Sequence, residues 1–251
     1  MSGHSKWSSI KHKKGAADIK RGKLFSKLSR AIIVAAKEGG GDPDGNLALQ
    51  NAVEKARSYS MPKDNIERAI AKGAGEGAGA QAYETVVYEG YGPGGVAIIA
   101  EALTENRNRT AAEVRHTFSK HGGNLGTDGS VNWMFERRGV VLVPADGVDE
   151  DALMLAAAEG GADDVAGDGS SFEVTSAPEA LREVRQAIED AGFQIESAEL
   201  TMLPKTTVEL TEESAASTVV KLVEALEELD DVQEVYANFD IPEQLLEAVA
   251  S

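Results

Sequence analysis

Hydrophobic residues recur at helical spacing along the first 73 residues. Apolar side chains such as Leu24, Leu28 and Ile32 fall on one side of a helix, and lysines and arginines fall on nearly the opposite side. The same period, ended by glycines and reopened at Pro62, predicts three short helices at about 19–39, 47–58 and 62–73. We expect these helices to share a modest core.

From Tyr83 onward the apolar pattern changes between strand and helix periods. The preceding stretch, 73–80, has glycine at alternate positions, which is typical of a flexible linker. Strands are predicted at 83–88, 96–103, 130–136, 139–143, 172–175, 195–203, 206–210 and 233–239, and helices at 110–121, 149–160, 178–191 and 214–229.

This order of elements predicts an α+β multidomain protein. An N-terminal three-helix domain, 1–76, is followed by two ferredoxin-like α/β domains. The elements after 205 make a poor domain alone, but they complete a second set when joined to 81–130. We therefore expect a discontinuous second domain, 81–130 and 205–241, with the third domain, 131–204, inserted into it.

Two local patterns need an interpretation. Gly90 to Gly95 matches the glycine spacing of a dinucleotide-binding loop, but a β-branched strand follows it instead of a helix, so we interpret these glycines as turn residues. Val131, Trp133 and Phe135 alternate as in a strand, so we expect Trp133 to lie in a core and not on a stacking surface.

Charge is distributed unequally along the 251 residues. The whole chain has a net charge of -17, yet residues 1–37 carry ten basic side chains and one acidic side chain, Asp18. Residues 139–251 carry four basic and 27 acidic side chains. This asymmetry predicts an anionic partner at the N-terminal end, while the acidic remainder discourages nonspecific wrapping of nucleic acid.

The basic arm, residues 2–15, leads into a basic-faced helix, which is typical of nucleic-acid-binding proteins. We predict phosphate contacts from the cations and base stacking from the tryptophan, with these candidates: Lys6, Trp7, Lys11, His12, Lys13, Lys14, Lys20, Lys23, Lys27 and Arg30. Two alternatives share the pattern, a solvated lysine-rich surface and an amphipathic helix on a membrane. We interpret the leucines and the phenylalanine of the helix as part of a domain core and not as a membrane contact.

Arg107 and Arg109 complete the predicted nucleic-acid-binding set. They precede the helix predicted at 110–121, whose free N-terminal amides favour anions. The alternative is that both arginines pair with nearby carboxylates such as Glu101, Glu105 or Glu113.

The sequence contains no pattern typical of an enzyme. It has no cysteine, which excludes disulfides, thiolate metal sites and cysteine nucleophiles. The histidines lack zinc-protease spacing, and neither a nucleophile elbow nor a P-loop is present. We expect no catalytic residue, metal, cofactor or small-molecule substrate. No apolar run is long enough to span a bilayer and no secretory signal is visible, so we expect a cytoplasmic protein.

Several motifs resemble those of the YebC/PmpR family. They are GHSKW (3–7), KHKK (11–14), YEGYGPGG (88–95), NRNRT (106–110), GGNLG (122–126) and VNWMFERRG (131–139), and they cover essentially the whole chain. The resemblance implies a helical N-terminal domain, two α/β domains and a probable DNA-binding transcriptional regulator. Relatives, including a mitochondrial translational activator of a cytochrome oxidase subunit, imply instead a ribosome-associated factor that relieves stalling on proline-rich nascent chains.

Two functional hypotheses therefore stay open. A regulator of duplex DNA needs Arg, Asn or Gln on the exposed helix face to contact bases, whereas this face is mostly lysine. A translation factor bound to ribosomal RNA needs only shape and phosphate recognition, with stacking from the arm. The lysines favour the second hypothesis and the family resemblance favours the first.

Overall fold

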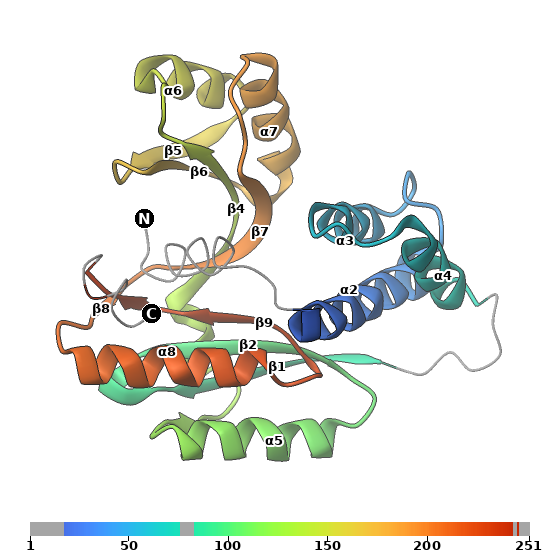
Figure 1. Ribbon diagram of the computed structural model, residues 1–251, viewed down its shortest axis with the longest axis vertical. Helices are drawn as coiled ribbons and strands as arrows, with labels where there is room; N and C mark the ends of the chain where they lie inside the picture. The colour runs from blue at the N-terminus through green and yellow to red at the C-terminus, as the bar shows by residue number, and fades with distance from the viewer. Residues whose placement is uncertain (1–17, 76–82, 243–244, 246–251) are drawn as a thin grey trace.

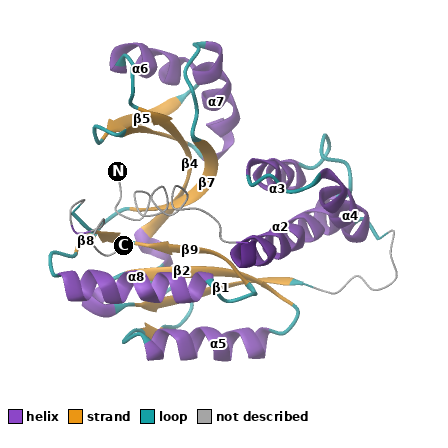
Figure 2. Ribbon diagram, viewed as in Figure 1, coloured by secondary structure: helices purple, strands orange, loops and turns teal. Residues whose placement is uncertain are grey.

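The structure, a computed structural model, describes residues 18–75, 83–242 and 245. Within these residues, a group of helices packs beside two α/β units, each built on its own four-stranded sheet (Figure 1, Figure 2). The predicted α+β multidomain class is confirmed, and the helices predicted in the first 73 residues are present.

The helical unit consists of α2 (Asp18–Gly39), α3 (Leu47–Ser58) and α4 (Lys63–Gly73). The apolar faces of the helices form one core, which includes Leu28, Ile32, Leu49, Val53 and Ile66. Gly73 lets α4 lie close to α2, because a Cβ at this position would come within 2.4 Å of the carbonyl oxygen of Ile33.

Buried Asn46 fixes the junction between α2 and α3. Its Oδ1 accepts a hydrogen bond from the Leu49 amide at 3.1 Å, and its Nδ2 donates to the carbonyls of Ala35 and Gly40 at 2.7 and 2.8 Å. One side chain thus satisfies backbone groups that lack partners at the end of one helix and the start of the next.

The second unit has an antiparallel sheet with the strand order β3-β1-β2-β9. Helices α5 (Arg107–Lys120) and α8 (Glu213–Glu227) cover one face of it, where Phe118, Leu222 and Leu226 are buried (Figure 1). The strands are β1 (Glu84–Tyr91), β2 (Ala97–Thr104), β3 (Asn124–Leu125) and β9 (Val232–Ala237).

The turn between β1 and β2 contains a 3-10 turn, η1 (Pro93–Gly95). Gly94 and Gly95 have φ values of 73° and 79°, which side chains with a Cβ rarely adopt. The interpretation of this glycine cluster as turn residues is confirmed.

The third unit is ferredoxin-like. Its order along the chain is βαββαβ, and its antiparallel sheet has the strand order β5-β6-β4-β7. Its elements are β4 (Phe135–Pro144), α6 (Glu150–Glu159), β5 (Ala162–Gly167), β6 (Ser171–Ser176), η3 (Pro178–Ala180), α7 (Leu181–Asp190) and β7 (Ser197–Pro204).

Three details of the predicted strands are wrong. The strands predicted at 130–136 and 139–143 are a single strand, β4, preceded by a 3-10 turn. Strand β5 has no counterpart in the prediction, because this edge strand is acidic and half-exposed and therefore lacks an apolar alternation. The segment predicted as a strand at 206–210 forms the short β8 (Val208–Glu209), which pairs with β10 (Phe239–Asp240) in a separate parallel ladder. The fourth place in the sheet of the second unit belongs to β3 instead.

The second and third units share a small apolar core on the sheet face opposite α5 and α8. Val131 and Phe135, which enter the third unit, pack there against Ala97, Ile99 and Tyr236. Between these two anchors the chain forms a 3-10 turn, η2 (Asn132–Met134), where a strand was predicted. The turn breaks the alternation of side chains, with consequences for Trp133 that are described below.

Candidate nucleic-acid interface

The predicted nucleic-acid-binding residues divide into three groups by position. Lys6, Trp7, Lys11, His12, Lys13 and Lys14 lie outside the described residues, and only the backbone of Lys20, in α2, is described. Lys23, Lys27 and Arg30 lie together on α2 and face the second unit. Arg107 and Arg109 lie in the first turn of α5.

The basic face of α2 contacts the C-terminal end of α8. Lys23 donates to the carbonyl oxygen of Glu228 at 3.5 Å, and Lys27 donates to that of Glu227. Arg30 donates to the carbonyl oxygen of Asp230. The last carbonyls of a helix lack partners and carry partial negative charge, and α8 has no basic residue in its own last turn. Helix α2 therefore supplies cations that this helix end lacks.

Asp231 connects α2 with α5. Its carboxylate accepts hydrogen bonds from Thr104 (3.1 Å), Thr110 (2.7 Å) and Arg109 (2.7 Å), and it lies 3.5 Å from the Arg30 guanidinium. Burial alone would raise the pKa of Asp231, but the hydrogen bonds outweigh it and hold the pKa below its ordinary value. The carboxylate is therefore charged and fully engaged.

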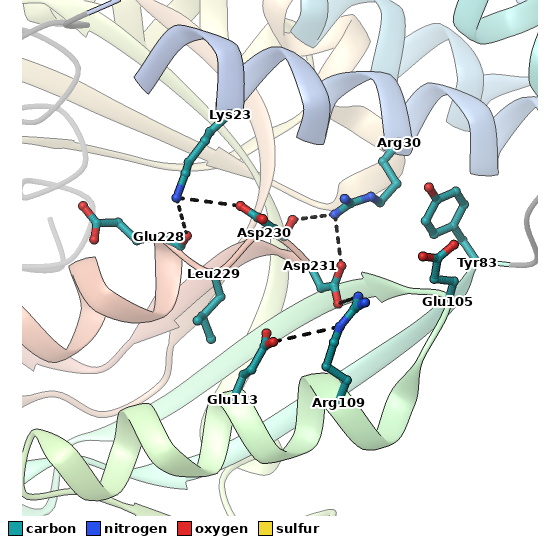
Figure 3. A pocket seen from close by; sticks show the side chains of 10 residues that line it. All are labelled: Lys23, Arg30, Tyr83, Glu105, Arg109, Glu113, Glu228, Leu229, Asp230 and Asp231. Carbon is teal, nitrogen blue, oxygen red and sulfur yellow. Dashed lines mark hydrogen bonds and ion pairs between the residues drawn. The ribbon is translucent and has the colours of Figure 1, made fainter. Parts of the chain in front are cut away.

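Arg109 accordingly follows the alternative that the sequence left open, because it also lies 3.9 Å from Glu113. Around these side chains lies an open pocket of about 450 Å³ (Figure 3). It is lined by Lys23, Arg30, Tyr83, Glu105, Arg109, Glu113, Glu228, Leu229, Asp230 and Asp231. The five carboxylates outnumber the three cations, so the pocket is not an anion site in this arrangement.

A second contact between the units is centred on Lys55 of α3. Its ammonium pairs with Glu234 of β9 and lies 3.8 Å from Glu199 of β7. Burial lowers the pKa of Lys55, but these two carboxylates raise it by more. Next to it, Glu54 lies 3.5 Å from Arg185 of α7. The helical unit is thus joined to both α/β units by charged groups.

The outer face of α5 carries cations without such partners. Arg107, Arg115 and Lys120 are exposed, and none of these side chains forms an ion pair or hydrogen bond with a described residue. Among the predicted nucleic-acid-binding residues whose side chains the structure describes, Arg107 is thus the one whose side chain has no ion pair or hydrogen bond with a described residue.

The prediction that Trp133 lies in a core is wrong. The indole is 65% exposed, because η2 rotates it away from the buried Val131 and Phe135. Tyr91, at the end of β1, is 37% exposed and donates from its hydroxyl to the Ser130 carbonyl oxygen at 2.9 Å. The sequence did contain a signal for the turn that exposes Trp133, since Gly126 and Gly129 favour a turn directly before it.

Comparison with known proteins identifies this architecture. The class that the fold defines is an α+β multidomain protein with a helical N-terminal unit and two α/β units. Residues 5–76 match the model of the TACO1/YebC protein N-terminal domain, and residues 83–239 match that of the TACO1/YebC second and third domain. The chain belongs to the TACO1/YebC family.

Similar proteins extend over the whole chain. A probable transcriptional regulatory protein of Rubrobacter xylanophilus is 60% identical, with 100% of both chains covered. Probable transcriptional regulatory protein GSU1074 of Geobacter sulfurreducens is 56% identical over 98% of this chain and 99% of its own. The crystal structure of a conserved hypothetical protein, Aq1575 of Aquifex aeolicus, is 53% identical with a TM-score of 0.79, covering 90% of this chain and 93% of that chain.

The Rubrobacter and Geobacter proteins carry names that denote regulators, which supports a role in regulation for this chain. Among the helices of the described ranges, none combines the length and apolar character that crossing a bilayer requires. In those ranges no group of three or more His, Cys, Asp or Glu side chains is placed to hold a metal ion.

Proposed function

We propose that this protein is a cytoplasmic nucleic-acid-binding regulator of gene expression. The observation that carries the proposal is the net charge of +9 in residues 1–37 of a chain whose total is -17. Lysine and arginine at this density bind phosphates through release of counterions, and the acidic remainder keeps the contact local. The names of the similar proteins support a DNA-binding transcriptional regulator as the first candidate.

A second candidate is a translation factor bound to ribosomal RNA. The observation in its favour is that Lys23, Lys27 and Arg30 face α8. In this arrangement α2 is not free to enter the major groove of duplex DNA, which a recognition helix must do. Recognition by the arm, through phosphates and unpaired bases, requires no such groove.

The test of nucleic-acid binding replaces Lys13 and Lys14 with glutamate. Each lost phosphate contact should flatten the slope of log K against log salt by roughly 0.7 to 0.9, for both DNA and RNA oligonucleotides. The binding constant would be measured by fluorescence anisotropy at several salt concentrations. The matched control is Arg182→Glu with Lys221→Glu, which changes the net charge equally at exposed cations of α7 and α8. If both double variants have the same slope, the arm is not at the interface.

Cross-linking in cells separates the two candidates. A photoreactive group introduced in the arm would be cross-linked, and the attached nucleic acid would be sequenced. Recovery of mainly ribosomal RNA contradicts the transcriptional candidate, and recovery of promoter DNA contradicts the translational one.

A further inference from the structure

Two exposed aromatic side chains share one hydrogen-bond acceptor beside the second unit. The hydroxyl of Tyr91 and the indole N–H of Trp133 both donate to the carbonyl oxygen of Ser130, at 2.9 and 3.1 Å. The two donor atoms therefore lie close together. Tyr91 comes from the end of β1 and Trp133 from η2, so the pair joins segments 42 positions apart in the sequence.

The loop that carries Trp133 is held from below by a buried carboxylate. Glu89 accepts hydrogen bonds from the amides of Gly129 (2.7 Å), Val131 (2.7 Å) and Asn132 (2.8 Å). Burial would raise the pKa of Glu89, but these three bonds lower it overall, so the carboxylate stays ionised. With Val131 and Phe135 also buried on either side, the position of Trp133 is fixed although its ring is exposed.

The hydrogen-bond donors of both aromatic side chains are already used. An exposed tryptophan or tyrosine commonly offers its N–H or hydroxyl to a ligand, but here the Ser130 carbonyl accepts both. What remains for a ligand is the surface of the rings. A proline-rich peptide has no internal hydrogen bonds and presents carbonyls that need donors, so it fits poorly here. Stacking of a nucleobase needs only a ring face.

The charge next to the pair differs between its two sides. The Lys205 amide donates to the Met134 carbonyl at 2.8 Å, which places Lys205 beside η2. This lysine is exposed, and its ammonium has no ion-pair partner in the part of the chain that the structure describes. Asp128 lies on the other side of Ser130 along the loop and repels phosphate. A nucleotide would therefore place its phosphate on the Lys205 side.

We propose that Trp133 and Tyr91 form a stacking site for an unpaired base of single-stranded nucleic acid, with Lys205 as the phosphate contact. The site deepens the proposed function and rests on it, since it assumes a nucleic-acid partner. It adds contact with a base to the phosphate contacts of the arm. Because every base has a stacking face, the site tolerates different sequences.

The test uses the full chain carrying Trp7→Phe, so that Trp133 is its single tryptophan. A 12-nucleotide oligoadenylate should quench its fluorescence, whereas an abasic oligonucleotide of the same length and charge should not. A DNA version of the oligoadenylate, run in parallel, compares the two sugar backbones. Adding Trp133→Ala removes this fluorophore, so binding is then measured by the anisotropy of a labelled oligoadenylate. It should weaken about tenfold, as expected for loss of one stacked base, with the salt slope unchanged.

Three controls accompany this test. Trp133→Tyr should restore part of the affinity, because a smaller ring still stacks. Leu155→Ala removes another apolar side chain that is 65% exposed and should leave binding unchanged. Calorimetric melting should show that Trp133→Ala and Leu155→Ala melt within a few degrees of the parent chain, as expected for surface substitutions.

The outcomes separate this proposal from the function it rests on. Equal quenching by the abasic oligonucleotide, or unchanged affinity of Trp133→Ala, would overturn the stacking site while leaving the arm untouched. An unaltered salt slope for the arm variant, with base-dependent quenching retained, would overturn the role of the arm alone. Quenching by a decaproline peptide but not by oligoadenylate would show a peptide site instead and would contradict the proposal.

Discussion

Asp231 is the residue at which α2, α5 and the sheet of the second unit meet. Its side chain is only 5% exposed, yet it is charged, because Thr104, Thr110 and Arg109 donate to it. A buried carboxylate is tolerated only when its oxygens are hydrogen-bonded and a cation is near. Both conditions are met here by residues of three separate elements.

Replacing Asp231 with asparagine should lower the free energy of unfolding by about 2 kcal/mol at pH 7. The folded-state pKa of Asp231 is lowered, so the charged carboxylate contributes its stability above the unfolded-state value, near 4, and loses it as the pH falls through the folded-state value. The difference between wild type and variant should therefore shrink below about pH 4. Calorimetric melting from pH 7 to pH 3 measures this. The control is Asp230→Asn, whose side chain is 75% exposed. A difference that stays constant down to pH 3 would contradict the assignment.

At the scale of elements, the contact between α2 and α8 adds cations to the C-terminal end of a helix. Helix α8 ends at Glu227, and Glu228 is its C-cap. Two acidic residues thus lie at the negative end of a helix dipole, which is unfavourable. The cations of α2 reverse this by donating to the carbonyls there. The contact joins residues about 200 positions apart in the sequence.

Removing these contacts should destabilise the protein. Lys27→Ala and Arg30→Ala should each lower the free energy of unfolding by about 1 to 2 kcal/mol, since each deletes a charged hydrogen bond. The matched control is Lys37→Ala on the same helix, which is exposed and has no partner among the described residues. It should change stability by less than about 0.5 kcal/mol. Equal melting temperatures for all three variants would show that the contact contributes nothing.

At the scale of the whole molecule, charged pairs hold the helical unit against the two α/β units. Lys55 contacts Glu234 of one sheet and Glu199 of the other. Removal of the Lys55 ammonium leaves two carboxylates facing one another. This destabilises the fold more than the absence of all three charged groups would.

Lys55→Met should therefore lower the melting temperature by about 2 to 6 °C, corresponding to about 1 to 2 kcal/mol. Adding Glu234→Gln should recover part of the loss, because one of the unpaired carboxylates is then neutral. Lys63→Met, which removes an 84% exposed lysine from an i,i+4 pair on α4, serves as the control. Differential scanning calorimetry measures all three, and a double variant no more stable than Lys55→Met would contradict the explanation.

How much the sequence predicted depends on how local the determining interactions are. Helix α3 was predicted at 47–58 and lies there, because its apolar period and flanking residues are local signals. Trp133 was misplaced because one 3-10 turn changes the side on which a residue lies. The pairing of Lys27 and Arg30 with α8 depends on tertiary structure, which periodicity does not contain. The domain limits and the nucleic-acid contacts stay predictions.

The position of α2 on α8 turns phosphate recognition by this helix into an exchange reaction. A polyanion that reaches Lys23, Lys27 or Arg30 competes with main-chain oxygens that these cations already contact. Its affinity then reflects the difference in free energy between the new contacts with phosphate and the lost contacts with main-chain oxygens. Any ligand that succeeds loosens the molecule that it binds.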